Sequence, residues 1–148
     1  MGDAPLVLIE ELQTPVEDLW ALWTDPEEVT RWLAGSASID LRVGGSYLLS
    51  GHLLSHALSD PVGGPIVGLE EEYVLKVAWR LPSSLGTALH ELTPPGTLVV
   101  LFQPLGPNRT RLRLEQDGFG SGPEGEAALQ WQKQVWADVL AHLKQKSG

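Results

Sequence analysis

The segment EGEAALQWQKQVWADVLAHLK (residues 124–144) decides the fold of this chain, because its apolar residues recur with the period of a helix. Projected at about 100° per residue, they form one continuous arc made of Ala128, Leu129, Trp131, Val135, Trp136, Val139, Leu140 and Leu143. The opposite side carries Glu126, Gln130, Lys133, Ala137, Ala141 and Lys144. Gln132 lies in the middle of the apolar arc, where a core helix would carry leucine. This helix is therefore expected to lie across a sheet, with a polar contact at its centre.

The composition is that of an ordinary globular protein, with 43% hydrophobic and 20% charged residues in a chain of 148. We expect one domain that spans residues 1–148. The net charge of −9 argues against nucleic acid or an anionic membrane surface as the partner, because both require a basic footprint. The absence of cysteine excludes disulfides, thiolate nucleophiles and cysteine-ligated metals. Without a signal peptide or an apolar run of about 20 residues, we expect a cytoplasmic protein with no membrane insertion.

The N-terminal part predicts a strand followed by two short helices. Leu6–Leu12 reads as the strand, and Thr14 is expected to cap the first helix, with Glu17 as its partner in a capping box. The segment Asp25-Pro26-Glu27-Glu28 repeats the start signal, so a second helix is expected to run to about Leu33. Two helices joined in this way form a V rather than one rod.

After the second helix the period of the sequence changes to two, which is typical of strands. The segment 39–43 predicts a half-buried strand, and Gly44-Gly45 supplies the turn to the next one. The inward positions of these two strands are Ile39, Leu41, Val43, Tyr47 and Leu49. Ser59–Pro65 is expected to be a turn, and Pro82–Gly96 a long loop. Further strands are predicted at Ile66–Leu69, Tyr73–Trp79, Thr97–Gln103 and Arg109–Gln116, the last with its arginines facing outward.

The order of elements predicts the fold class. A strand, two short helices, about six antiparallel strands and a long helix indicate an α+β protein. We expect a curved antiparallel sheet of about seven strands, with the C-terminal helix across its concave face and the short helices closing one end.

Three stretches and one tryptophan resemble a known family. The run TPVEDLWALWTDPEE (14–28) with Arg31-Trp32, the run DLRVGGSY (40–47), the run TRLRLEQDGF (110–119) and Trp131 are similar to elements of the activator of heat-shock protein 90 ATPase-like family. That family belongs to the START / Bet v 1 (SRPBCC) superfamily of helix-grip proteins. The resemblance implies a helix-grip fold, a hydrophobic ligand held between sheet and helix, and a contact with a chaperone. Members often carry a histidine where this chain has Gln116, so a role of that histidine does not transfer. The large N-terminal domain of the cochaperone is absent from this sequence, which weakens the chaperone interpretation.

Catalytic and metal-binding patterns are not completed. His52 and His56 have a spacing that binds zinc on a helix, but four residues of strand span about 13 Å, whereas two zinc ligands lie within about 4 Å. The glycines around Ser46 do not form a nucleophile elbow, and Pro123 stands where a dinucleotide fingerprint needs its third glycine. We therefore predict no metal, no cofactor and no catalytic residues.

The aromatic residues predict a ligand cavity instead. The side chains expected to meet between sheet and helix are Trp32, Tyr47, Trp79, Phe102, Gln116, Phe119, Trp131, Gln132 and Val135. A buried Gln132 without a partner would cost about 1–3 kcal/mol, so it should bond to a neighbouring strand or loop, or to a ligand or water.

Three hypotheses for function follow from these observations. The first is a binding protein for a hydrophobic or amphipathic, lipid-like small molecule, without catalysis. The second is an enzyme of the cyclase or hydrolase type in the same superfamily, with His90 or Tyr47 as acid or base. The third is a module that contacts a chaperone through its acidic surface.

Overall fold

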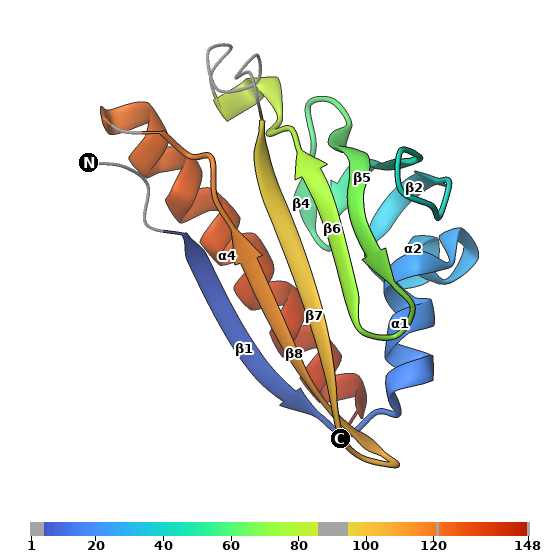
Figure 1. The fold of residues 1–148 in the computed structure, drawn as a ribbon. Helices are drawn as coiled ribbons and strands as arrows, with labels where there is room; N and C mark the ends of the chain where they lie inside the picture. The colour runs from blue at the N-terminus through green and yellow to red at the C-terminus, as the bar shows by residue number, and fades with distance from the viewer. Residues whose placement is uncertain (1–4, 86–94, 121, 148) are drawn as a thin grey trace.

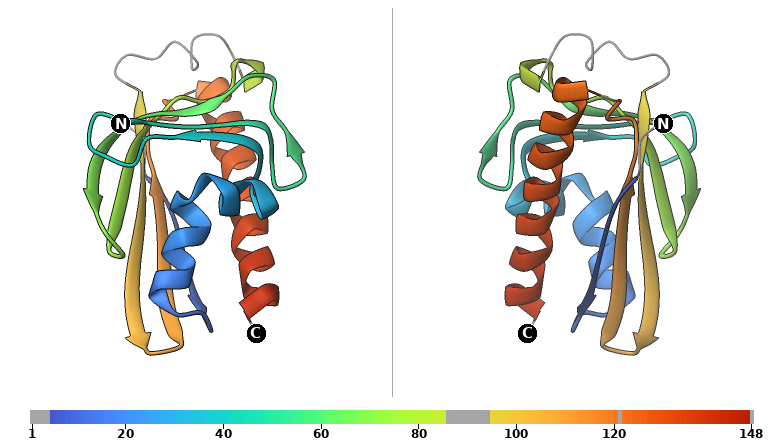
Figure 2. Two further views of the ribbon diagram at one scale, coloured as in Figure 1. Left: turned by 90° about the vertical axis from the view of Figure 1, so that its right-hand side faces the viewer. Right: turned by 90° about the vertical axis from the view of Figure 1, so that its left-hand side faces the viewer.

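A curled antiparallel sheet wraps around one long helix in this protein (Figures 1 and 2). The computed structural model describes residues 5–85, 95–120 and 122–147. The sheet follows the order β1-β8-β7-β6-β5-β3-β2, with the short β4 paired to β3. Its strands are β1 (Leu6–Leu12), β2 (Ala34–Ile39), β3 (Ser46–Leu53), β4 (His56–Ala57), β5 (Val62–Glu70), β6 (Val74–Trp79), β7 (Gly96–Gly106) and β8 (Arg109–Gln116). The helices are α1 (Val16–Thr24), α2 (Pro26–Trp32), the short 3-10 helix η1 (Ser83–Leu85) and α4 (Gly122–Ser147).

This arrangement confirms the predicted helix-grip fold. Helix α4 runs along the concave side of the sheet, and α1 with α2 lies at one end of it (Figure 2). The predicted apolar arc of α4 faces the core, where Val135 and Trp136 are fully buried. None of the helices in the described part of the chain is both long and apolar enough to cross a membrane.

The starts of the two short helices differ in how they are capped. Thr14 does not cap α1: the capping position is Pro15, and no side chain accepts a hydrogen bond there. The backbone carbonyl of Thr14 instead accepts a hydrogen bond from Thr110 Oγ1 at 2.8 Å, which ties the start of α1 to β8. Helix α2 starts as predicted, because the Asp25 side chain accepts a hydrogen bond from the Glu27 amide at 3.0 Å.

Two predicted boundaries in the sheet are wrong. Strand β2 covers Ala34–Ile39 rather than residues 39–43, so Leu41 and Val43 are 41% and 61% exposed. The backbone after Ile39 turns instead, and the amide of Gly44 (φ +89°) donates to the Ile66 carbonyl at 2.9 Å.

Strand β5 begins at Val62, inside the segment predicted as a turn. Gly63 fits there because a β-carbon at this position would lie 2.0 Å from the carbonyl oxygen of Tyr47 on the neighbouring strand.

Strand β8 alternates strictly between the two faces of the sheet, as predicted. Its inward side chains are Thr110, Leu112, Leu114 and Gln116, all 2% exposed or less. Its outward side chains are Arg109, Arg111, Arg113 and Glu115. The inner face of the sheet therefore forms the core against α4, and the outer face carries charge.

Candidate functional site

Two glutamines link α4 to β8 in the interior of the protein. Gln132 is 0% exposed on the inner side of α4, and Gln116 is 2% exposed at the end of β8. Gln116 Nε2 donates a hydrogen bond to Gln132 Oε1 at 3.3 Å. Trp136, four residues further along α4, donates from Nε1 to Gln116 Oε1 at 2.6 Å. Gln116 of the sheet thus bonds to two residues, Gln132 and Trp136, on the same side of α4.

The indole group sets the direction of this chain of hydrogen bonds. A tryptophan Nε1–H only donates, so the atom of Gln116 that faces Trp136 is its oxygen. The amide nitrogen of Gln116 then faces Gln132, whose oxygen accepts. Gln132 Nε2 is left buried with no partner in the part of the chain that the structure describes. Gln132 therefore bonds to the sheet through its oxygen and keeps a free donor on the other side of its amide.

Two more unpaired donors surround the same tryptophan. Trp23 of α1 and Trp79 of β6 have ring centroids 6.1 Å and 5.6 Å from that of Trp136. Both rings are buried, at 1% and 2% exposure, and among the described residues neither Nε1–H has a hydrogen-bond acceptor. Together with Gln132 Nε2, three buried donors without acceptors belong to one group of side chains. We call Trp23, Trp79, Gln116, Gln132 and Trp136 the donor cluster.

Tyr47 and Trp32 were predicted to line the cavity, but their polar atoms serve the end of α1. The last carbonyls of a helix have no partner within it. Tyr47 OH donates to the Trp23 carbonyl at 2.6 Å, and Trp32 Nε1 donates to the Leu22 carbonyl at 2.9 Å. Burial raises the pKa of Tyr47 well above its ordinary value. A hydroxyl held in this way keeps its proton at neutral pH, which makes it a poor acid or base.

The remaining predicted residues divide between the interior and its rim. Phe102, Phe119 and Val135 are at most 2% exposed within the core. Trp131 is only partly buried and lies edge-on to His56, with ring centroids 6.5 Å apart. The structure therefore brings Trp79, Gln116 and Gln132 together around one centre, while Trp131 lies at the outer edge of α4.

The histidine pair tested for zinc binding is divided between two strands. His52 lies on β3, whereas His56 lies on β4 and its Nε2 contacts Asp138 Oδ2 of α4 at 2.8 Å. Among the described residues, no group of three or more His, Cys, Asp and Glu side chains is placed to hold a metal ion. His90, the other histidine considered for catalysis, lies outside the described residues.

The donor cluster includes two residues that the sequence did not assign to the site. Trp23 and Trp136 each lie on the buried side of an amphipathic helix, a position typical of core residues. A signal was available for Trp136, because it lies four residues after Gln132 and so on the same side of α4 as the amide. No comparable signal marked Trp23, whose ring meets that of Trp136 only in the folded protein.

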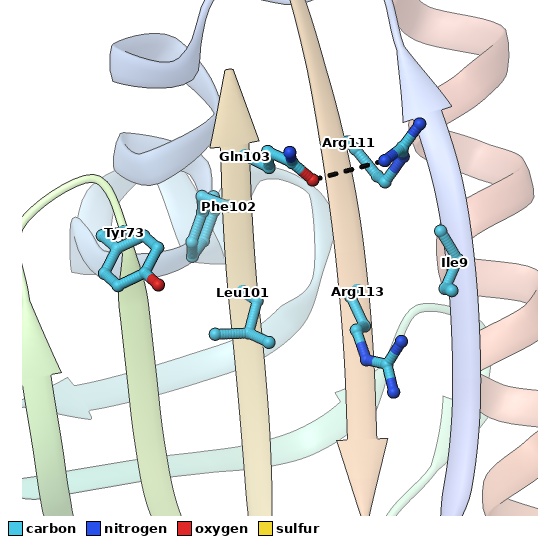
Figure 3. Close-up of a pocket in the computed structure, with 7 residues that line it drawn as sticks. All are labelled: Ile9, Tyr73, Leu101, Phe102, Gln103, Arg111 and Arg113. Carbon is cyan, nitrogen blue, oxygen red and sulfur yellow. Dashed lines mark hydrogen bonds between the residues drawn. The ribbon is translucent and has the colours of Figure 1, made fainter. Parts of the chain in front are cut away.

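Two surface hollows lie away from the donor cluster. One of about 660 Å³ lies on the outer face of the sheet and is lined by Ile9, Tyr73, Leu101, Phe102, Gln103, Arg111 and Arg113 (Figure 3). A smaller one of about 260 Å³ lies where the end of α4 meets α1 and α2, and is lined by Thr14, Leu22, Glu28, Arg31, Trp32, Leu143 and Lys146. Of the predicted cavity residues, only Phe102 and Trp32 border these hollows.

The fold is shared with proteins of low sequence identity. A protein from Mesorhizobium loti, MLL2253, matches with a TM-score of 0.73 at 23% identity, over 96% of this chain and 95% of that chain. An HSP90 activator from Plasmodium falciparum matches with a TM-score of 0.70 at 22% identity, over 93% and 91%. DynU16, described as a putative protein in the dynemicin biosynthetic locus, matches with a TM-score of 0.70 at 20% identity, but this chain covers only 46% of it. At these identities the likeness shows the fold alone.

The sequence itself carries the assignment to a family. No curated protein matches it. A family model described as "Activator of Hsp90 ATPase homolog 1-like protein" matches residues 13–147, which is nearly the whole chain and includes both glutamines of the donor cluster. This chain belongs to the Activator of Hsp90 ATPase homolog 1-like family.

Proposed function

We propose that this protein binds a small amphipathic molecule between α4 and the sheet, with the polar end of the molecule at the donor cluster. The observation that carries the proposal is a group of three buried donors that have no acceptor among the described residues: Trp23 Nε1, Trp79 Nε1 and Gln132 Nε2. All three are hydrogen-bond donors, so the group that complements them is an acceptor such as a carboxylate or a carbonyl oxygen.

Buried hydrogen-bond donors rarely stay unpaired in proteins. Leaving one such group without a partner costs about 1–3 kcal/mol, and most buried polar groups in proteins are paired. Three of them around a single ring, Trp136, would therefore cost several kcal/mol if nothing complemented them. An ordered water is the competing explanation, because a buried water typically bonds to two to four polar groups.

The surroundings of the donor cluster favour an apolar body for the ligand. The core between sheet and helix is formed by aliphatic and aromatic side chains, among them Phe102, Phe119 and Val135. Small-molecule sites in proteins are mostly apolar, with a few placed polar groups that fix the orientation of the ligand. A fatty carboxylate or a similar lipid-like molecule meets both requirements.

Binding without catalysis is part of the proposal. The side chains of the donor cluster are amides and indoles, and neither exchanges protons near neutral pH. Tyr47, the nearest ionisable candidate from the sequence, donates to the Trp23 carbonyl and has a raised pKa. We therefore assign the interior a role in holding a molecule rather than in transforming one.

Native mass spectrometry of the purified protein, before and after solvent extraction, tests the proposal. We expect a co-purifying mass or, after extraction, binding of straight-chain carboxylates from hexanoate to hexadecanoate. Binding should change tryptophan emission, because Trp23 and Trp79 are in the site. Trp79→Phe replaces the indole by a smaller aromatic ring and removes the Nε1–H donor, and should weaken binding about tenfold, as expected for one charge-assisted hydrogen bond.

Trp131→Phe is the matched control, since this tryptophan lies on α4 but only partly buried at its rim. It should leave the affinity unchanged. Equal affinities for wild type and Trp79→Phe, or a protein that is empty and binds none of the carboxylates, would refute the proposal and leave ordered water as the partner of the donors.

A second candidate function is contact with a chaperone. It is favoured by the family to which the chain belongs and by the likeness to the Plasmodium falciparum HSP90 activator. With a net charge of −9, such a complex should depend on electrostatic attraction and weaken as salt is added. A pull-down with an Hsp90 chaperone at low and at high salt measures this directly, and no complex at low salt would end this candidate.

A further inference from the structure

The outer face of the sheet carries a hollow that the proposed interior site does not use. Its volume, about 660 Å³, lies within the range of about 300–1,000 Å³ that is typical of small-molecule sites. It spans three neighbouring strands, because Ile9 belongs to β1, Arg111 and Arg113 to β8, and Leu101 and Gln103 to β7 (Figure 3). Tyr73 closes one side, held beside β7 by a backbone hydrogen bond from the Phe102 amide to its carbonyl at 2.8 Å.

The strand register arranges these side chains in two rows. In one row Arg113 pairs with Ile9 on β1 and with Leu101 on β7, so a cation is flanked by two aliphatic side chains. In the next row Arg111 pairs with Glu11 and Gln103. The apolar members are open to solvent, since Ile9 is 49% and Tyr73 56% exposed. An apolar surface around a central guanidinium is therefore available on this face.

The two arginines differ in how their hydrogen bonds are used. Arg111 is engaged on both sides, by Glu11 Oε2 at 3.1 Å and by Gln103 Oε1 at 3.3 Å. Arg113 bonds to Glu115 Oε2 at 3.1 Å through Nε alone. Its two terminal nitrogens have no protein partner in the described part of the chain. Those terminal nitrogens form one side of the guanidinium fork, which binds a carboxylate with two parallel hydrogen bonds.

The charge on this face is opposite to that of the molecule. Among the described residues, Arg109, Arg111 and Arg113 form ion pairs with two glutamates, Glu11 and Glu115, whereas the whole chain carries a net charge of −9. A small anion is therefore attracted to this face in preference to the rest of the surface. A nucleic acid or an anionic membrane would meet the negative remainder of the protein as well, which excludes an extended anionic partner.

We propose that this hollow binds a small aromatic carboxylate. The flat ring lies over the pleated sheet between Ile9, Leu101 and Tyr73, and the carboxylate accepts hydrogen bonds from the two terminal nitrogens of Arg113. A planar body suits a site whose floor is the surface of a sheet, and guanidinium groups also stack on aromatic rings. The site is distinct from the donor cluster, because it lies on the opposite face of the sheet and its polar groups are charged.

A titration of the full chain, labelled with ¹⁵N and followed by NMR, tests the site with naphthalene-2-carboxylate as the probe. Saturable shifts are expected at the amides of Ile9, Leu101 and Arg113. Naphthalene-2-carboxamide, which has the same ring without the charge, should bind about tenfold more weakly. Arg113→Gln should weaken the binding of naphthalene-2-carboxylate by about the same factor.

Arg42→Gln provides a matched control variant. Arg42 bonds through Nε to Asp40 at 2.8 Å, two residues away, just as Arg113 bonds through Nε to Glu115. The variant Arg42→Gln removes one surface cation of the same kind without changing the hollow, and should leave the affinity for naphthalene-2-carboxylate unchanged. The proposal is overturned if the chemical shifts do not saturate at residues of β1, β7 and β8. It is also overturned if naphthalene-2-carboxamide binds as well as the carboxylate, or if Arg113→Gln and Arg42→Gln lose the same affinity.

Discussion

Strand β8 presents two kinds of polar group on its two faces, and their environments differ sharply. On the inner face, Gln116 is 2% exposed and bonds to Trp136 and Gln132 of α4. On the outer face, Arg111 and Arg113 form ion pairs whose partners, Glu11 and Glu115, are open to solvent. The neutral hydrogen bonds are buried, and the formal charges are exposed.

The two environments determine which polar contacts hold the fold together. A buried donor that loses its partner cannot turn to water, so breaking one inner bond costs about 1–3 kcal/mol. An exposed ion pair loses little, typically about 0–1 kcal/mol, because water and salt replace the partner. The outer charges are thus available for recognition, whereas the inner amides determine how α4 sits on the sheet.

Gln116→Leu should destabilise the protein most, because it disrupts the buried hydrogen bonds on the inner face of β8. It removes the acceptor of Trp136 Nε1 and the donor to Gln132 Oε1 together. We expect the free energy of unfolding to fall by about 2–4 kcal/mol, measured by urea denaturation. Glu115→Gln, one residue earlier and on the outer face, is the control and should cost less than about 1 kcal/mol. Similar losses for the two variants would contradict the comparison.

Tyr47→Phe tests a single buried hydrogen bond, because it removes the hydroxyl and keeps the ring. The Trp23 carbonyl at the end of α1 loses its partner, and we expect a loss of about 1–2 kcal/mol. Burial raises the pKa of Tyr47 in the folded state, so the folded protein favours the protonated form. The contribution of this proton to stability is complete below about pH 10, which is the ordinary pKa of tyrosine, and it is lost as the pH rises further.

The pH dependence of unfolding between about pH 8 and 11 is therefore the second measurement on Tyr47. Wild type should lose stability above about pH 10 more steeply than Tyr47→Phe does. Parallel curves for the two proteins would show that the buried hydroxyl is not linked to folding.

The smallest effect on stability is expected on the outer face. Arg111→Gln removes the ion pair with Glu11, and the free energy of unfolding should hardly change, because both side chains are exposed to solvent. The Glu11 carboxylate also lies 3.5 Å from Arg109, and this ion pair is kept in the variant. The hydrogen bond from Arg111 is the main cause that lowers the pKa of Glu11, so an NMR titration should show this pKa rising in the variant. A large loss of stability would contradict the assignment of the outer charges to recognition.

The order of elements and the two faces of β8 were predictable, because each depends on the local period of the sequence. Asp25 caps α2 and the outward arginines of β8 are where the pattern indicated. The wrong boundaries depend on distant contacts. Residues 41–43 alternate like a strand, but the turn there is fixed by a bond from Gly44 to Ile66. Gly63 extends β5 because it fits under the Tyr47 carbonyl.

The candidate site was predictable in part for the same reason. A glutamine in an apolar arc indicates a polar contact, and the structure shows one to Gln116. The sequence does not tell which atom of an amide is left over, since this depends on the donor that reaches Gln116 from Trp136. Nor does it distinguish Tyr47 and Trp32, which donate to the last carbonyls of α1, from Trp79, whose indole has no acceptor in the described part of the chain.

We propose that the free donor of Gln132 serves a bound molecule. Gln132→Leu exchanges one unpaired amide for another, because Gln116 Nε2 then loses its acceptor. Without ligand, its free energy of unfolding should therefore stay within about 1 kcal/mol of wild type. The decisive measurement is the unfolding of both proteins in urea with and without dodecanoate. We predict that dodecanoate stabilises wild type markedly and the variant much less, since the variant should bind about tenfold more weakly. Equal stabilisation of both proteins, or of neither, would contradict the account.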